Sequence, residues 1–210
     1  MATAPRIGAN RLNAIAQLPN VVSKGLEPGL FKPPSTVPFR AMPSRMPPKS
    51  GGEPTFMQYQ PQVEGFDIEE ARRVLVHVFA PWVQDLGLSV SGVECDPPPG
   101  AAADWQPGAV LRMAFSERLC RHGGIVCGQA LMALADTSMV FAILAANRGF
   151  RPMTTVDQTT HFMRAVTRSD VLADARVVRL GRTMSFGRVT LSSASDNKPV
   201  AMVSSAFAML

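Results

Sequence analysis

The sequence has little cysteine and little charge, and both shortages narrow the classes of protein that it can encode. Its 210 residues include only three cysteines, Cys95, Cys120 and Cys127. Three cysteines cannot close a disulfide framework of the kind that stabilises small secreted domains, which favours a reducing compartment. Charged residues make up 18% of the chain, too few for a coiled coil, whereas 46% are hydrophobic, enough for a sizeable core. We therefore expect one folded domain, alone or with a tail.

The sequence also lacks the short motifs that mark several large enzyme classes. It has no phosphate-binding P-loop, no glycine fingerprint of dinucleotide-binding folds and no Gly-x-Ser-x-Gly nucleophile elbow. Cys120 and Cys127 do not have the spacing of a structural zinc site, and adding His122 would still leave a fourth ligand missing. The sequence therefore predicts neither a bound metal nor another cofactor.

Acidic residues are almost absent from the first quarter of the chain. Residues 1–52 contain seven basic residues and one acid, a net charge of +6, whereas residues 53–210 contain 14 basic and 15 acidic residues, a net charge of −1. The basic surplus of the protein thus belongs to its N-terminal segment. It does not indicate a basic surface on the folded part, so we expect no nucleic-acid partner.

Ten of the 18 prolines also fall within the first 54 residues. Because proline fixes φ and removes a backbone donor, neither a helix nor a central strand can run through such a segment. We predict that residues 1–54 form a disordered, Pro-rich basic tail and that residues 55–210 form the folded domain. The segment has no long apolar run typical of a secretory signal, and we expect a cytoplasmic protein. Mitochondrial import is a minor alternative, because the segment is basic and nearly free of acids.

After the tail, the apolar pattern predicts a helix, two strands, a long apolar helix and four strands. The first helix should begin at Asp67, which is a suitable N-cap, and end near Pro81. The long helix should cover residues 125–147, and strands are expected at 86–95, 108–115, 154–163, 171–180, 183–193 and 200–209. These elements predict an α+β fold in which an antiparallel sheet of about six strands wraps around a long central helix.

Asp136 is the only charged residue between Ile125 and Ala146 in the long helix. The helix is long enough to cross a membrane, but the strands that follow need a sheet in which to pair, and we expect no membrane span. An ionised carboxylate in a core helix is costly unless it is paired or reaches a polar cleft. Two interpretations therefore stay open: a hydrogen bond to a neighbouring strand, or a general base or nucleophile.

Gly128, near the start of the same helix, could provide a second functional group. Helix N-termini present free backbone N–H groups, and a glycine lets a ligand approach them closely, which suits a developing oxyanion. Gly128 and Asp136 are eight residues apart, or about 12 Å along the helix axis. One helix cannot bring both groups to one carbonyl. If the protein is an enzyme, we infer a two-fold dimer in which antiparallel helices share two sites.

The run GQALMALADT at residues 128–137 resembles the hotdog-fold thioesterases of the PaaI type, whose signature is His-Gly-Gly followed by an apolar helix and Leu-Ala-Asp-Thr. Residues 154–164 and 170–182 resemble the next two strands of that family. The resemblance implies a hotdog fold over residues 67–210 and hydrolysis of acyl-CoA thioesters by a homodimer or a tetramer of dimers. It also implies that Asp136 is the catalytic carboxylate, that the backbone of Gly128 polarises the thioester carbonyl, and that Thr155 positions water.

The sequence departs from the family signature at its histidine. In register with Asp136, the His-Gly-Gly position reads Cys127-Gly128-Gln129, and a separate His122-Gly123-Gly124 lies five residues earlier. Because the histidine is missing in register, a second hypothesis is a non-hydrolytic hotdog protein that binds acyl-CoA or a protein partner. The candidate substrate-binding residues are His122, Cys127, Gln129, Arg179 and Arg182.

Basic residues and the remaining histidines complete the candidate set. Arginines cluster around the late strands and could meet CoA phosphates or simply form a solvated face; they are Arg164, Arg168, Arg179 and Arg182. His77 is expected on the first helix as a surface or partly buried residue, and His161, in mid-strand, is expected in the core.

Overall fold

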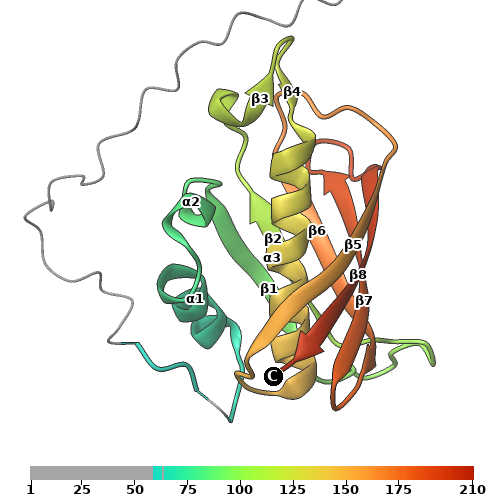
Figure 1. The fold of residues 1–210 in the computed structure, drawn as a ribbon. Helices are drawn as coiled ribbons and strands as arrows, with labels where there is room; N and C mark the ends of the chain where they lie inside the picture. The colour runs from blue at the N-terminus through green and yellow to red at the C-terminus, as the bar shows by residue number, and fades with distance from the viewer. Residues whose placement is uncertain (1–58, 63) are drawn as a thin grey trace, which may run out of the picture. The chain divides into compact units, whose positions relative to one another are not determined.

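The computed structural model of the chain describes residues 59–62 and 64–210 (Figure 1). The predicted disordered tail at residues 1–54 lies outside the described residues, as does the start of the predicted domain at residues 55–58. The predictions for residues 64–210 can be compared with the structure directly.

Helix α1 (Ile68–His77) begins where the sequence predicted, because the carboxylate of Asp67 accepts a hydrogen bond from the backbone N–H of Glu70 at 2.8 Å. The prediction that this helix continues to Pro81 is wrong. It ends at His77, and Pro81 instead starts a separate short helix, α2 (Pro81–Gln84). Proline is favoured at a first helical position, where no N–H is needed and its fixed φ suits the helix.

Glu70 anchors residues before α1 to that helix. Its side chain is only 2% exposed and accepts hydrogen bonds from the backbone N–H of Gln62 at 2.9 Å and from Nε of Arg73 at 2.8 Å. The hydroxyl of Tyr59 donates to the same carboxylate. Burial of Glu70 opposes its ionisation, but these hydrogen bonds outweigh burial and lower its pKa.

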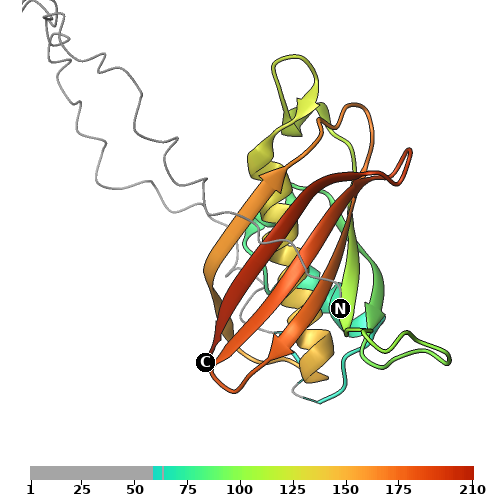
Figure 2. The ribbon, with the colours of Figure 1, turned by 90° about the vertical axis from the view of Figure 1, so that its right-hand side faces the viewer.

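A six-stranded antiparallel sheet forms one layer of the domain, with the strand order β1-β2-β6-β7-β8-β5. Figure 2 shows this sheet in front of the long helix, with β5 at one edge and β1 and β2 at the other. The fold is the predicted hotdog arrangement, and each strand lies within two residues of its predicted bounds. The strands are β1 (Leu88–Glu94), β2 (Gly108–Met113), β5 (Met153–Phe162), β6 (Val171–Leu180), β7 (Met184–Ser193) and β8 (Pro199–Met209).

The long helix α3 (Gly128–Asn147) lies in the curve of this sheet and carries much of the core (Figure 1). Leu134, Phe141 and Leu144 are fully buried in it. On the side away from β5, the ring of Phe79 stacks on that of Phe141 with a centroid distance of 5.5 Å. By length and mean hydropathy α3 could cross a membrane, but 67% of its most apolar window is buried inside the protein. It is therefore apolar on nearly all sides as a core helix.

Helix α3 begins three residues later than predicted. Ile125–Val126 form strand β4, which pairs with β3 (Cys120–Arg121) in a small hairpin at the start of the helix. Gly123 and Gly124 form its turn with φ values of 89° and 69°. Glycine is the residue that tolerates such φ values, so these two glycines make a hairpin turn rather than a helix start.

Candidate active site

Asp136 lies in the third turn of α3, half-buried and facing the edge strand β5. The hydroxyl of Thr155, near the start of β5, donates a hydrogen bond of 2.8 Å to its Oδ1. Burial raises the pKa of Asp136, and the Thr155 hydroxyl offsets only part of that rise. No ion pair among the described residues includes Asp136. The structure thus holds a carboxyl group with strengthened basicity and a single side-chain partner.

A β-bulge in β5 directs the side chains that meet α3. Thr155 pairs with Phe207 of β8 and Asp157 pairs with Ala206, so Val156 is the extra residue between them. In a regular strand, residues three apart point to opposite faces. Because of the bulge, both Thr155 and Gln158 contact α3, the first at Asp136 and the second at the backbone carbonyl of Met132.

The far end of β5 packs against the first turn of α3. A Cβ atom added to Gly128 would lie 3.1 Å from Cζ of Phe162, so the ring of Phe162 covers the open side of this glycine. The N-cap residue Cys127 makes no side-chain capping hydrogen bond, which leaves the N–H groups of this turn without a side-chain cap. Gly128 therefore combines a helix N-terminus that has no side-chain cap with a close helix–strand contact.

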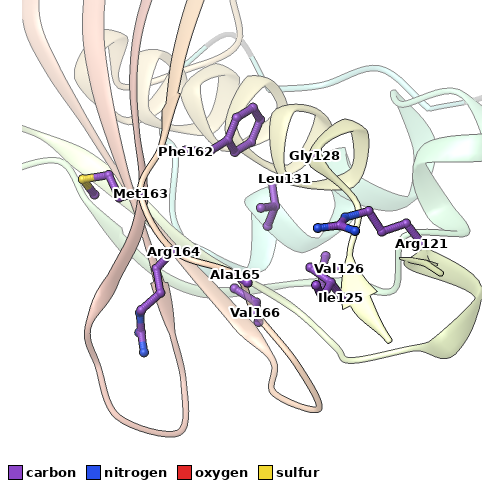
Figure 3. Close-up of a pocket in the computed structure, with 10 residues that line it drawn as sticks. All are labelled: Arg121, Ile125, Val126, Gly128, Leu131, Phe162, Met163, Arg164, Ala165 and Val166. Atoms are coloured by element: carbon purple, nitrogen blue, oxygen red, sulfur yellow. The ribbon is translucent and has the colours of Figure 1, made fainter. Parts of the chain in front are cut away.

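A cavity of about 400 Å³ opens beside this first turn (Figure 3). Leu131, Val126 and Phe162 give it apolar walls, and Figure 3 shows the guanidinium of Arg121 reaching toward the first turn of α3. Arg164 also borders the cavity, but its side chain pairs with Asp196 at 2.7 Å. The arrangement can hold an apolar group close to the N-terminus of α3.

Three of the candidate binding residues lie near Gly128. His122 is exposed in the β3–β4 turn and borders a second cavity of about 400 Å³, together with Arg121 and Arg168. Cys127 is half-buried, and its backbone N–H donates to the carbonyl of Leu119 at 2.8 Å. Gln129 is exposed on the first turn of α3. The structure brings these side chains to one end of the helix.

The other two candidates lie at the opposite end of the sheet. Arg179 and Arg182 are exposed near the β6–β7 turn, and the carbonyl of Arg182 accepts a hydrogen bond of 2.6 Å from Arg151. Strand pairing across β6, β7, β8 and β5 puts Leu180 in the same row as Thr155. These two arginines are therefore at the Thr155 end of the sheet, away from Gly128.

Two further expectations do not agree with the structure. His161 is exposed rather than buried, because it alternates with Phe162, which faces α3, and therefore points to the outer face of the sheet. The four late arginines do not form one cluster, since Arg164 and Arg168 border the cavities near the start of α3, whereas Arg179 and Arg182 lie at the Thr155 end of the sheet. His77 is half-buried and stacks on Tyr59 with a centroid distance of 5.0 Å.

Besides Thr155, the β5 residues Gln158 and Phe162 contact α3, and the sequence did not predict either contact. The alternation of side chains along β5 predicts which of them face α3 only if the bulge at Val156 is known. A bulge leaves no clear sign in a single sequence. Among the described residues, no group of three or more His, Cys, Asp or Glu side chains could hold a metal ion.

Comparison with known proteins connects this geometry to a family. A family model described as the thioesterase superfamily matches residues 123–200, which include Gly128, Asp136 and Thr155. A proposed esterase of Pseudomonas aeruginosa is 32% identical over 91 residues, 43% of this chain and 68% of that protein. A proposed esterase of Halobacterium salinarum is 30% identical over 144 residues, 63% of this chain and 84% of that protein.

Solved structures agree on the fold. Zebrafish thioesterase superfamily member 2 aligns with a TM-score of 0.57 and 22% identity, covering 70% of this chain and all of the zebrafish chain. The Escherichia coli PaaI protein from the phenylacetic acid degradation operon aligns with a TM-score of 0.54 and 17% identity, covering 67% of this chain and 91% of its own. The chain therefore belongs to the thioesterase superfamily and has its hotdog fold.

Proposed function

We propose that this protein hydrolyses the thioester of an acyl-CoA to a free acid and CoA, with Asp136 as base or nucleophile. The observation that carries the proposal is the Asp136–Thr155 pair, a half-buried carboxyl group whose pKa is raised by burial and which no cation neutralises among the described residues. A carboxylate of strengthened basicity is suited to activate water or to attack a carbonyl.

Two chemical routes fit a single carboxylate. As a base, Asp136 takes a proton from water while the water oxygen bonds to the thioester carbon; the carbon–sulfur bond then breaks, and the proton passes to the CoA sulfur. As a nucleophile, Asp136 forms an acyl anhydride and releases CoA thiolate, and water then cleaves the anhydride. In either route Thr155 holds the carboxylate through its hydroxyl.

We further propose that the oxyanion donor comes from a second copy of the chain. Gly128 and Asp136 lie two turns apart on one helix, too far to serve one carbonyl. An exposed surface joins α3 and β5: Met132 is 40% exposed on the helix, and Val156 is 59% exposed on the edge strand. A homodimer that covers this surface would place Gly128 of the partner subunit near Asp136. A tetramer of two such dimers is the larger alternative.

The candidate binding residues would then act at different parts of the substrate. His122, Cys127 and Gln129 surround the donor end, where the acyl thioester is expected. Arg179 and Arg182 are exposed at the Thr155 end and are proposed to meet the CoA phosphates. A cytoplasmic location remains part of the proposal.

A panel of acyl-CoA esters tests the proposal through release of free thiol. Asp136→Asn should lower kcat/KM by about 10²-fold or more, because it removes the proton acceptor. Asp157→Asn is the matched control, since Asp157 is an aspartate near Thr155 on the same strand but, unlike Asp136, is exposed. Equal rates for the wild type and Asp136→Asn would remove Asp136 from the mechanism.

A non-hydrolytic protein is the second candidate, and two observations favour it. Cys127 stands where the family has a histidine, and the ring of Phe162 packs over the neighbouring Gly128. If the wild type binds acyl-CoA tightly but releases no thiol from any ester in the panel, binding is the function.

A further inference from the structure

Three buried side-chain oxygens between β5, β8 and α3 have no hydrogen-bond partner among the described residues. They are Oε1 of Gln158, Oγ1 of Thr160 and Oγ of Ser205, and we refer to them as the polar trio. Strand pairing makes them neighbours, because Gln158 is directly opposite Ser205 and Thr160 follows Gln158 by two residues on the same face. Ser205 is only 5% exposed. Buried polar atoms are almost always satisfied, so three such oxygens in one place call for a polar occupant.

Gln158 connects the polar trio to α3 one turn before the candidate acid. Nε2 of Gln158 donates a hydrogen bond of 3.2 Å to the backbone carbonyl of Met132. In an α-helix that same carbonyl accepts the N–H of Asp136, four residues later. The residue that Gln158 binds on α3 is thus about 6 Å from Asp136 along the helix axis, on the side of Gly128.

We propose that Gln158, Thr160 and Ser205 hold an internal water molecule beside α3, and that Gln158 is a positioning residue for Asp136. The chemistry of the trio suits water, since a buried water makes about three hydrogen bonds. The amide oxygen of Gln158 can only accept, whereas the two hydroxyls can donate or accept. The water therefore joins two strands of the sheet to the helix through Gln158.

The two hydrogen bonds from β5 to α3 fix the distance between this strand and the helix next to Asp136. Gln158 binds the helix at Met132, and Thr155 binds it one turn later at Asp136. If Gln158 loses its water, its amide no longer has a defined orientation, and the Met132 carbonyl loses its anchor. The carboxylate of Asp136 then has more freedom to leave Thr155 and to become hydrated.

Matched substitutions test the water site without reference to activity. Thr160→Val and Ser205→Ala remove the two hydroxyls of the trio with little change in shape. Their controls are Thr159→Val and Ser204→Ala, which remove hydroxyls from two exposed residues that pair with each other on the outer face of the same strands. A high-resolution crystal structure of the wild type should show an ordered water bonded to at least two trio oxygens.

The unfolding temperature gives the second readout. Thr160→Val and Ser205→Ala should leave it unchanged or lower it, because each removes a partner of the water. If no water binds these hydroxyls, each is a buried polar group without a hydrogen-bond partner. Removing it then removes its desolvation cost and raises the unfolding temperature. A dry site together with a raised unfolding temperature overturns the proposal.

Gln158→Met, which keeps the length of the side chain and removes its amide, tests the positioning role. A loosened turn admits water to Asp136, which lowers its pKa, and weakens the Thr155 contact, which raises it. Burial is the larger of the two effects, so the titration of the Asp136 carboxyl, followed by carbon NMR, should shift toward the ordinary aspartate range. This part rests on the proposed function only for its kinetic readout: kcat should fall by about tenfold, with KM within about twofold. An unchanged titration midpoint of Asp136, or a raised KM with unchanged kcat, contradicts the positioning role of Gln158. If the wild type releases no thiol, that result contradicts only the proposed function.

Discussion

At the scale of single residues, the environment of Asp136 determines how well its carboxyl group can serve as the proposed base or nucleophile. An exposed aspartate is a weak base at neutral pH, whereas burial in α3 raises the pKa of Asp136 and makes its carboxylate more basic. The Thr155 hydroxyl acts in the opposite direction by stabilising the charged form. The balance of these two effects sets the pH range in which the carboxylate is available.

Thr155→Val should therefore move the pH dependence of the reaction. Asp136 must be ionised to act, so kcat/KM should rise with pH through its pKa. Removing the hydroxyl removes the contact that lowers this pKa, and the rising limb should move to higher pH. Thr155→Ser, which keeps the hydroxyl, should leave the limb nearly in place. A profile that Thr155→Val does not move would show that Asp136 does not control the rate.

Glu70 shows how a buried acid serves stability instead of chemistry. It is 1% exposed and has a backbone N–H, a hydroxyl and a guanidinium as partners. Glu70→Ala should lower the free energy of unfolding by about 2–4 kcal/mol, because it leaves these donors unpaired. Glu69→Ala, one residue away, removes an exposed salt bridge and should cost less than about 1 kcal/mol. Denaturant unfolding of both variants distinguishes the two sites.

The pH dependence of this contribution follows from the lowered pKa of Glu70. The folded state holds the carboxylate more strongly than the unfolded chain does, so the contribution is complete above the ordinary glutamate range. It is lost as the pH falls through the lowered pKa of the folded state. Stability curves of the wild type and Glu70→Ala should converge in acid, and a constant difference down to low pH would contradict this account.

At the scale of elements, the distance between α3 and the sheet depends on a glycine in β7. A Cβ atom at Gly187 would lie 2.3 Å from Cε of Met139 and 2.8 Å from the backbone oxygen of Arg176. The helix can approach this strand only because no side chain stands between them. This close approach holds α3 in the curve of the sheet and so brings Asp136 to the edge strand.

Gly187→Ala should consequently destabilise the fold by about 1–3 kcal/mol through overpacking. Met139→Ala in the same chain should recover part of the loss, but only part, because the contact with the Arg176 backbone persists. Gly92→Ala is the control, since a Cβ there would be 4.0 Å from Val110. Thermal unfolding measures all three variants, and equal effects of Gly187→Ala and Gly92→Ala would refute the packing argument.

The sequence predicted most elements because their apolar pattern is strong, and it failed where backbone geometry decides. Asp67 identified the start of α1, and the lone charge in α3 pointed to Asp136. The β3–β4 hairpin was missed because Ile125 and Val126 continue the apolar run of the helix. The sequence also could not predict which side chains of β5 face α3. The bulge at Val156 shifts the alternation of side chains along the strand, and Gln158 therefore contacts α3.

At the scale of the whole molecule, one chain holds the parts of the proposed thioesterase site at separate places. Asp136, near the middle of α3, binds Thr155 of β5, whereas Gly128 lies at the start of α3 beside a cavity. The sequence could predict this separation from helix geometry alone, but the pairing of two chains depends on surfaces that no single sequence pattern defines. The proposed dimer makes each site complete by combining residues of both subunits.

A subunit-mixing experiment tests this central claim most directly. Asp136→Asn removes the acid, and Gly128→Pro removes the proposed donor N–H at a first helical position, where the backbone accepts proline. The added Cβ would lie 3.1 Å from Cζ of Phe162, so this exposed ring must shift by a few tenths of an ångström to admit it. Each variant alone should be nearly inactive toward acyl-CoA. Unfolding and refolding the two together should restore about one quarter of wild-type activity, because half of the dimers would be mixed and one of the two sites in each would be intact. Mixtures that remain as inactive as the separate variants would contradict a site shared between subunits.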